Sequence, residues 1–229
     1  MDDLSHLNPV ARLILHSLAL DPDRVTLDTD LRSIDAADWP AFFDSADLHG
    51  VTPLIAQHWQ ALGLLDRLPS ETRDRLLRAY RDNTERNENI QREVIEYWNL
   101  ITAANIPAIL IKGWPLAELL HESPAVRLIT DMDMLVPRDR AQEGLVALQR
   151  AGLEPLPSDR DAWINKHLPS YWRLNGRTVI YPLKNMFDPD HPRSVELHVN
   201  LWEENFRGLQ LRDHTGFWER SRVIVVAGQ

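Results

Sequence analysis

The sequence has no cysteine, which excludes disulfide bonds, thiolate metal sites and cysteine nucleophiles and fits a reducing compartment. Its start, Met1-Asp2-Asp3-Leu4, lacks the basic region and the apolar core of a signal peptide. No apolar run approaches the length of a membrane-spanning helix. We therefore expect a cytoplasmic protein with no membrane segment, in which any bound metal has oxygen or imidazole ligands.

Basic side chains are also in the minority, with 25 lysines and arginines against 34 aspartates and glutamates and a formal net charge of −9. Such a net charge disfavours extended electrostatic binding of nucleic acid phosphates, so we expect a small-molecule or protein partner instead. The sequence has no internal repeat and no low-complexity tract. Its 229 residues, 44% of them hydrophobic, suffice for one large domain or two small ones.

Residues 1–105 are predicted to form a helical N-terminal region. Apolar residues recur at helical spacing from Asn8 to about Ala104, and the breaks between them fall at turn residues. No strand is needed to explain this pattern. The candidate helices are Pro9–Leu20, Trp39–His49, Thr52–Leu62 and a long helix that begins at Ser70.

Residues 106–229 are predicted to form an α+β domain with a small mixed sheet and flanking helices. The run Ile106–Ile111 is short, apolar and partly β-branched, as is typical of a buried strand, and Asn175-Gly176 is a strong hairpin signal. Since the chain ends soon after a predicted strand, it is compatible with a piece of a longer protein. The other predicted strands are Arg127–Val136, Tyr171–Arg173, Thr178–Tyr181, Ser194–Leu201 and Val223–Val226.

Two aspartates two residues apart, Asp131 and Asp133, indicate a metal site. Strand side chains alternate between the two faces, so these carboxylates share one face with Arg127. Their mutual repulsion becomes favourable if a hard divalent cation lies between them. Oxygen ligands prefer Mg²⁺ or Mn²⁺ to zinc.

The predicted strand Ser194–Leu201 places Glu196 and His198 on one face. If it neighbours the strand with Asp131 and Asp133, Glu196 becomes a third carboxylate. Three acids can hold two metal ions roughly 3.5–4 Å apart for in-line displacement at phosphorus, which is typical of phosphoryl or nucleotidyl transfer.

Each of these signals also has a structural interpretation. An Asp-x-Asp pair on a strand is more often a solvated face, and a lone histidine such as His198 is more often a structural hydrogen-bonding group than one that orients the acceptor. Four cations between residues 158 and 192 are either acceptor-binding groups or, more commonly, parts of a solvated loop. These are Lys166, His167, Arg173 and Lys184.

The order of these elements resembles the DNA polymerase beta-type nucleotidyltransferase superfamily. Its core has a strand ending at a glycine, a helix, a strand with Asp-x-Asp and a later strand with a third acid. The matching segments here are Ile111-Lys112-Gly113, Pro115–Leu120, Asp131-Met132-Asp133 and Val195-Glu196-Leu197. This sequence departs from the superfamily after Gly113, where Trp114 replaces the usual serine.

The chain is more closely similar to the bacterial family of uncharacterised nucleotidyltransferases, in the segments Ile109–Gly113, Asp131–Val136 and Glu196-Leu197-His198. The resemblance implies the nucleotidyltransferase fold and assigns three metal-binding catalytic acids, of which the third serves the metal that activates the acceptor. It also implies two cations that neutralise the triphosphate and a glycine that lets the backbone come close to it. The acids are Asp131, Asp133 and Glu196, and the nucleotide-binding residues are Lys112, Gly113 and Arg127.

We therefore expect an enzyme that uses Mg²⁺ or Mn²⁺ to move a nucleoside monophosphate from a nucleoside triphosphate to a hydroxyl of a small molecule or protein. One alternative is a non-catalytic member that binds nucleotide and acts as a regulatory or toxin–antitoxin component. A second alternative is a glycosyltransferase with a metal-binding Asp-x-Asp. Such enzymes have a nucleotide-binding unit of several strands before the motif, whereas helices precede a single predicted strand here.

Overall fold

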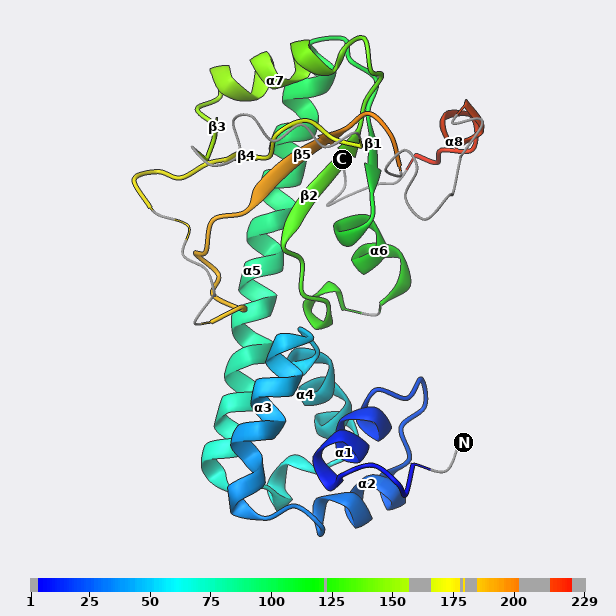
Figure 1. The fold of residues 1–229 in the computed structure, drawn as a ribbon, viewed down its shortest axis with the longest axis vertical. Coiled ribbons are helices and arrows are strands. Elements are labelled where there is room, and N and C mark those ends of the chain that lie inside the picture. Colours follow the sequence, from blue (N-terminus) through cyan, green and yellow to red (C-terminus); the bar gives the residue numbers. More distant parts are fainter. Residues whose placement is uncertain are drawn as a thin grey trace. The chain divides into compact units, whose positions relative to one another are not determined.

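A computed structural model describes residues 4–121, 123–156, 166–177, 179, 185–201 and 215–223 (Figure 1). Its helices and five-stranded mixed sheet confirm the predicted α+β class. Among the described residues, no helix is both long enough and apolar enough to cross a membrane.

The chain divides into two compact units. The first comprises Met1–Asn87, His121–Leu128 and Leu183–Pro189, and the second comprises Glu88–Leu120, Ile129–Pro182 and Asp190–Gln229. The predicted boundary at residue 105 marks the change from helices to strands along the sequence. The two units, in contrast, are defined by which residues pack together in the structure. The long helix α5, Ser70–Ala103, contributes residues to both units.

The first unit is helical, as predicted, and polar caps and prolines begin its helices. Asn8 accepts a hydrogen bond from the Ala11 amide at the start of α1, and Asp23 caps α2 in the same way. Helix α2 is absent from the sequence-based prediction. The elements are α1 (Pro9–Ser17), α2 (Arg24–Leu31), η1 (Ala36–Asp38), α3 (Trp39–Leu48), α4 (Thr52–Ala61), η2 (Leu65–Arg67), the first part of α5, and η3 (Pro124–Val126).

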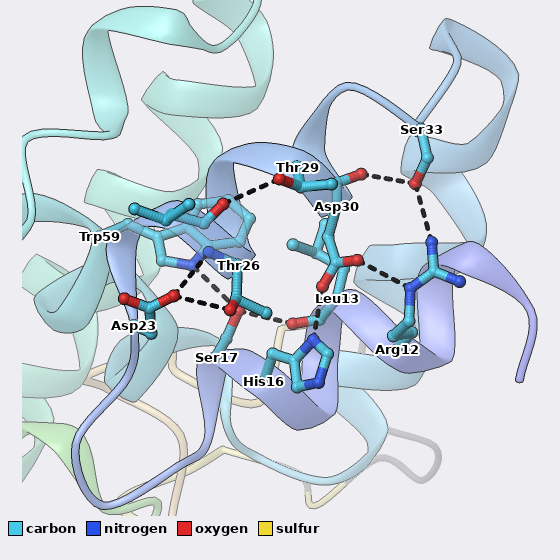
Figure 2. Close-up of polar contacts among 11 residues, drawn as sticks. Arg12, Leu13, His16, Ser17, Asp23, Thr26, Thr29, Asp30, Ser33 and Trp59 are labelled. Atoms are coloured by element: carbon cyan, nitrogen blue, oxygen red, sulfur yellow. Dashed lines mark hydrogen bonds and ion pairs between the residues drawn. The ribbon is translucent and has the colours of Figure 1, made fainter. Parts of the chain in front are cut away.

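A buried polar network connects helices α1, α2 and α4 within this unit (Figure 2). The Asp30 side chain, only 5% exposed, accepts hydrogen bonds from Arg12 Nε at 2.7 Å and contacts His16 Nδ1 at 2.6 Å. Ser17 Oγ accepts a hydrogen bond from Trp59 Nε1 at 2.9 Å. These contacts satisfy polar groups that would otherwise be costly to bury beside the apolar core.

The second unit contains the sheet, with strand order β1-β2-β5-β4-β3. Strands β2 and β5 are parallel, whereas the other neighbouring pairs are antiparallel. The part of α5 from Glu88 onward belongs to the same unit as the sheet, and so do three further helices. The strands are β1 (Ile109–Ile111), β2 (Asp131–Leu135), β3 (Glu154–Pro155), β4 (Tyr171–Trp172) and β5 (Ser194–His198); the helices are α6 (Gly113–Leu120), α7 (Ala141–Arg150) and α8 (Thr215–Glu219).

One face of the central strands packs into an apolar core with α5 and α7. Met132, Met134, Val195 and Leu197 alternate along β2 and β5 and are all at most 1% exposed. Helix α7 comes close to β5 at Gly144, where a Cβ would lie 2.8 Å from the Leu197 Cδ1 atom. The opposite face of β2 and β5 is therefore left for their polar side chains.

The observed strands are shorter than predicted, and the reason is clearest at Arg127. This residue follows η3 and is not part of β2, so the prediction that it shares a strand face with Asp131 is wrong. Its carbonyl accepts hydrogen bonds from Asn83 Nδ2 at 3.2 Å and Asn87 Nδ2 at 2.9 Å, contacts that replace sheet pairing. Strand β5 likewise ends at His198.

The predicted hairpin lies only partly within the described residues. Asn175 and Gly176 both have positive φ, 49° and 78°, as the turn signal predicted. Of the predicted strand 178–181 only Val179 is described, and residues 224–226 of the last predicted strand also lie outside the described part of the chain.

Candidate active site

Two acids and a histidine come together on the polar face of the two parallel strands. The register pairs Asp133 of β2 with Glu196 of β5, and it pairs Leu135 with His198. Directly paired residues share a face, and so do residues two apart on one strand. The sequence-based expectation that the two polar strand faces meet is therefore fulfilled for Asp133, Glu196 and His198.

Lys112 reaches the same cluster from the end of β1. Its backbone φ is +59°, an uncommon conformation for a residue with a side chain that costs on the order of 1 kcal/mol. The Lys112 carbonyl accepts a hydrogen bond from the Leu116 amide at the start of α6. The Lys112 Nζ atom lies 2.6 Å from Asp133 Oδ1 and 3.1 Å from His198 Nε2, so it balances the charge of the Asp133 carboxylate.

The group Asp133, Glu196 and His198 has the composition and spacing of a metal site. One ligand atom from each residue lies within 4.8 Å of the others. The Asp133 side chain is only 1% exposed and His198 is fully buried. A carboxylate that is buried to this extent requires a cationic partner, which Lys112 provides and a divalent cation could also provide.

The electrostatics of the cluster keep Glu196 ionised. Burial raises the pKa of this carboxyl, but the hydrogen bond to His198, the charge of His167 and the hydroxyl of Ser170 together lower it to about 2. Burial also lowers the pKa of His198, yet its hydrogen bonds to Asp133 and Glu196 raise it overall. At neutral pH the metal-free cluster thus favours a carboxylate at Glu196, and the two acids shift the titration of His198 toward its protonated form.

Asp131 lies at the start of β2 and is half-buried. Burial raises the pKa of the Asp131 carboxyl, and the negative charges of Asp133 and Glu196 raise it further. Asp131 therefore interacts electrostatically with both other acids. It is not one of the three residues whose ligand atoms converge. Its assignment as a metal ligand stays a prediction.

The two remaining nucleotide-binding candidates occupy different surroundings. Gly113 starts α6, where an added Cβ would lie 3.5 Å from Ile129 Cγ2, an ordinary van der Waals distance, so packing within the protein does not require a glycine here. Arg127 belongs to the first unit, whereas the acids belong to the second. The contacts of Gly113 and Arg127 with a triphosphate stay predictions.

Two residues near Glu196 went unrecognised or were misjudged in the sequence. His167 pairs with His198 across an isolated antiparallel bridge and is 6% exposed, so the interpretation of this residue as part of a solvated loop is wrong. Its Nε2 atom lies 3.5 Å from Glu196 Oε2. Ser170 Oγ donates a hydrogen bond to Glu196 Oε1 at 2.9 Å. No local sequence pattern identifies His167 or Ser170 as part of the site, because the bridge forms between segments that are distant in sequence.

The other cations of that segment have different outcomes. Arg173 makes a bidentate ion pair with Glu96 of α5, at 2.7 Å for both contacts, which is a structural role. Lys166 holds the bridge through its carbonyl, which accepts hydrogen bonds from the Val199 and Asn200 amides. Lys184 lies outside the described residues.

Comparison with known proteins agrees with this geometry. A family model described as uncharacterised nucleotidyltransferase matches residues 35–229, a range that contains both strands of the site. Searches of curated proteins and of solved structures found no match.

Proposed function

Since the chain belongs to the family of uncharacterised nucleotidyltransferases, we propose that it moves a nucleoside monophosphate from a nucleoside triphosphate to a hydroxyl of a small molecule or protein. One observation supports this most strongly. Asp133 and Glu196 face each other on parallel strands, and their carboxylates converge with the imidazole of His198. Such a group is suited to hold a divalent cation beside a triphosphate.

The donor chemistry of the cluster fits the expected metal. Asp133 and Glu196 would hold Mg²⁺ or Mn²⁺, with Asp131 as a further carboxylate on the same strand. When bound, the cation supplies Lewis acidity that withdraws charge from the phosphoryl oxygens. The ammonium group of Lys112, which lies 2.6 Å from Asp133 Oδ1, supports the view that the cluster attracts positive charge.

The proposed reaction forms one bond at phosphorus and breaks another. The acceptor hydroxyl oxygen attacks the α-phosphorus, and the bond from this phosphorus to the bridging oxygen breaks, so that pyrophosphate leaves with the bonding electrons. The hydroxyl proton passes through the Glu196 carboxylate to solvent. Lys112 would balance the charge of the triphosphate, since its side chain is 43% exposed and thus able to reach it.

A labelling experiment tests this function. The protein is incubated with labelled nucleoside triphosphates, Mg²⁺ or Mn²⁺ and a cell extract, and the label is followed into pyrophosphate and an acceptor. Asp131→Asn and Asp133→Asn should each lower transfer at least a hundredfold, because an amide binds a cation far more weakly than a carboxylate. Asp139→Asn is the matched control, since this exposed residue follows the same strand. Transfer that survives in both site variants would refute the assignment.

One observation favours the non-catalytic alternative. Trp114, which stands where the superfamily usually has a serine, has no hydroxyl to offer a phosphate, and its indole is buried at 2% exposure. If the protein only binds nucleotide, equilibrium dialysis will show binding of nucleoside triphosphate that depends on Asp133. The labelling experiment will then show no release of pyrophosphate with any acceptor fraction.

A further inference from the structure

Two imidazoles turn the same ring atom toward the carboxylates of the site. His198 Nε2 lies 2.7 Å from Asp133 Oδ1 and 3.4 Å from Glu196 Oε2. His167 Nε2 lies 3.5 Å from the same Glu196 oxygen, and the centroids of the two imidazole rings are 5.1 Å apart. The site therefore presents nitrogen as well as oxygen atoms, whereas the sequence motif suggested oxygen alone.

The opposite ring atom of each histidine faces a main-chain carbonyl. His167 Nδ1 lies 2.7 Å from the carbonyl oxygen of Leu168, and His198 Nδ1 lies 3.4 Å from that of Asn200. A carbonyl oxygen can only accept, so Nδ1 carries the hydrogen in both contacts. In the neutral imidazole the lone pair is then on Nε2, the atom that faces the acids. Imidazoles that bind metals commonly have this arrangement.

The backbone holds both rings in place without help from a metal. The Leu168 amide donates to the Leu197 carbonyl at 3.0 Å, and the Val199 amide donates to the Lys166 carbonyl at 2.8 Å. These bonds extend the pairing around the bridge between His167 and His198. Because the two histidines are 6% and 0% exposed, their rings have little freedom to turn away.

We propose that His167 and His198 join Asp133 and Glu196 as metal ligands, and that this mixed site selects a first-row transition metal ion over Mg²⁺. Mg²⁺ prefers an octahedral shell of oxygen atoms, whereas imidazole nitrogen favours transition metals. The geometry that carries the proposal is the position of His198 Nε2 beside both Asp133 and Glu196, and of His167 Nε2 beside Glu196. Its link to catalysis rests on the proposed function, but the metal preference does not.

Manganese is the probe that tests this proposal, because electron spin echo envelope modulation detects nitrogen nuclei bound to Mn²⁺. The wild-type protein should show coupling to two imidazole nitrogens, and Mg²⁺ should displace Mn²⁺ only at more than about a hundredfold excess. His167→Asn should leave coupling to one nitrogen and raise the Kd for Mn²⁺ at least about tenfold. The asparagine amide can still donate to the Leu168 carbonyl, but it has no atom at the position of Nε2.

Ser170→Ala is the matched control. It removes the hydroxyl that lies 2.9 Å from Glu196 Oε1 and keeps both imidazoles, so both nitrogen couplings should persist. Circular dichroism checks that each variant is folded, and the wild-type spectrum decides the question if His167→Asn does not fold. Bound Mn²⁺ without nitrogen coupling, displacement by equimolar Mg²⁺, or no Mn²⁺ binding would each overturn the proposal.

The two proposals fail in different ways. Nitrogen-coordinated Mn²⁺ in a protein that releases no pyrophosphate would refute the proposed transfer and leave the mixed metal site standing. Asp133-dependent transfer with Mg²⁺, in a protein whose Mn²⁺ spectrum lacks nitrogen coupling, would refute the mixed site alone.

Discussion

Tyr97 of α5 makes the stability of the protein depend on pH in the alkaline range. Its side chain is 1% exposed within the core of the second unit. Burial raises the pKa of the Tyr97 phenol to about 12, and the negative charge of Glu93 adds to the effect. An unfolded chain has a tyrosine pKa of about 10.

The expected effect follows from this difference. Between pH 10 and pH 12 the unfolded chain releases the phenol proton while the folded protein retains it, so ionisation favours unfolding. For pKa values of about 10 and about 12, the loss in the free energy of unfolding at pH 11 is about 1.4 kcal/mol. This contribution to stability is fully present below pH 10.

The assay compares wild type with Tyr97→Phe, which keeps the ring and removes the titrating hydroxyl. Urea unfolding is followed by circular dichroism at pH 9 and pH 11 for both proteins. Other groups that titrate in this range affect both equally, so the wild type should lose about 1.4 kcal/mol more than the variant. Equal losses would show that the Tyr97 phenol titrates normally in the folded protein and would refute the reasoning.

Two further substitutions test the polar networks of the two units. Asp30→Asn keeps the side-chain shape but removes the charge shared with Arg12, and should lower the free energy of unfolding by about 2–4 kcal/mol in urea titrations. Exposed Asp21→Asn should change it by less than about 0.5 kcal/mol. Lys112→Met removes the cation that lies 2.6 Å from Asp133, so calorimetry should show tighter Mn²⁺ binding. Weaker binding would mean that the lysine supports the metal site.

Local patterns in the sequence were sufficient to predict the type of most elements. The helical spacing of apolar residues identified α1, α3, α4 and α5, and the β-branched run before Lys112 identified β1. Helix α2 escaped prediction because its sequence, Arg24–Leu31, is polar and has a weakly marked apolar face. Strand ends were overestimated where side chains, such as those of Asn83 and Asn87, bind carbonyls that a longer strand would use.

Part of the site could also be predicted from local sequence patterns. Alternation along a strand is a local property, so the shared face of Glu196 and His198 could be anticipated from their spacing. The position of Arg127 could not, since its carbonyl accepts hydrogen bonds from the side chains of Asn83 and Asn87 instead of pairing with a neighbouring strand. The contribution of His167 was equally hidden, because a bridge to β5 leaves no periodic signal in its own segment.

The sequence by itself determined which polar side chains share a face of each strand, because the two-residue period of a strand is a property of the backbone. Only the tertiary structure decided that β2 and β5 are parallel neighbours in a register that pairs Asp133 with Glu196. It also decided that Lys112 and two imidazoles meet there. Strand pairing depends on long-range packing, which no local pattern encodes.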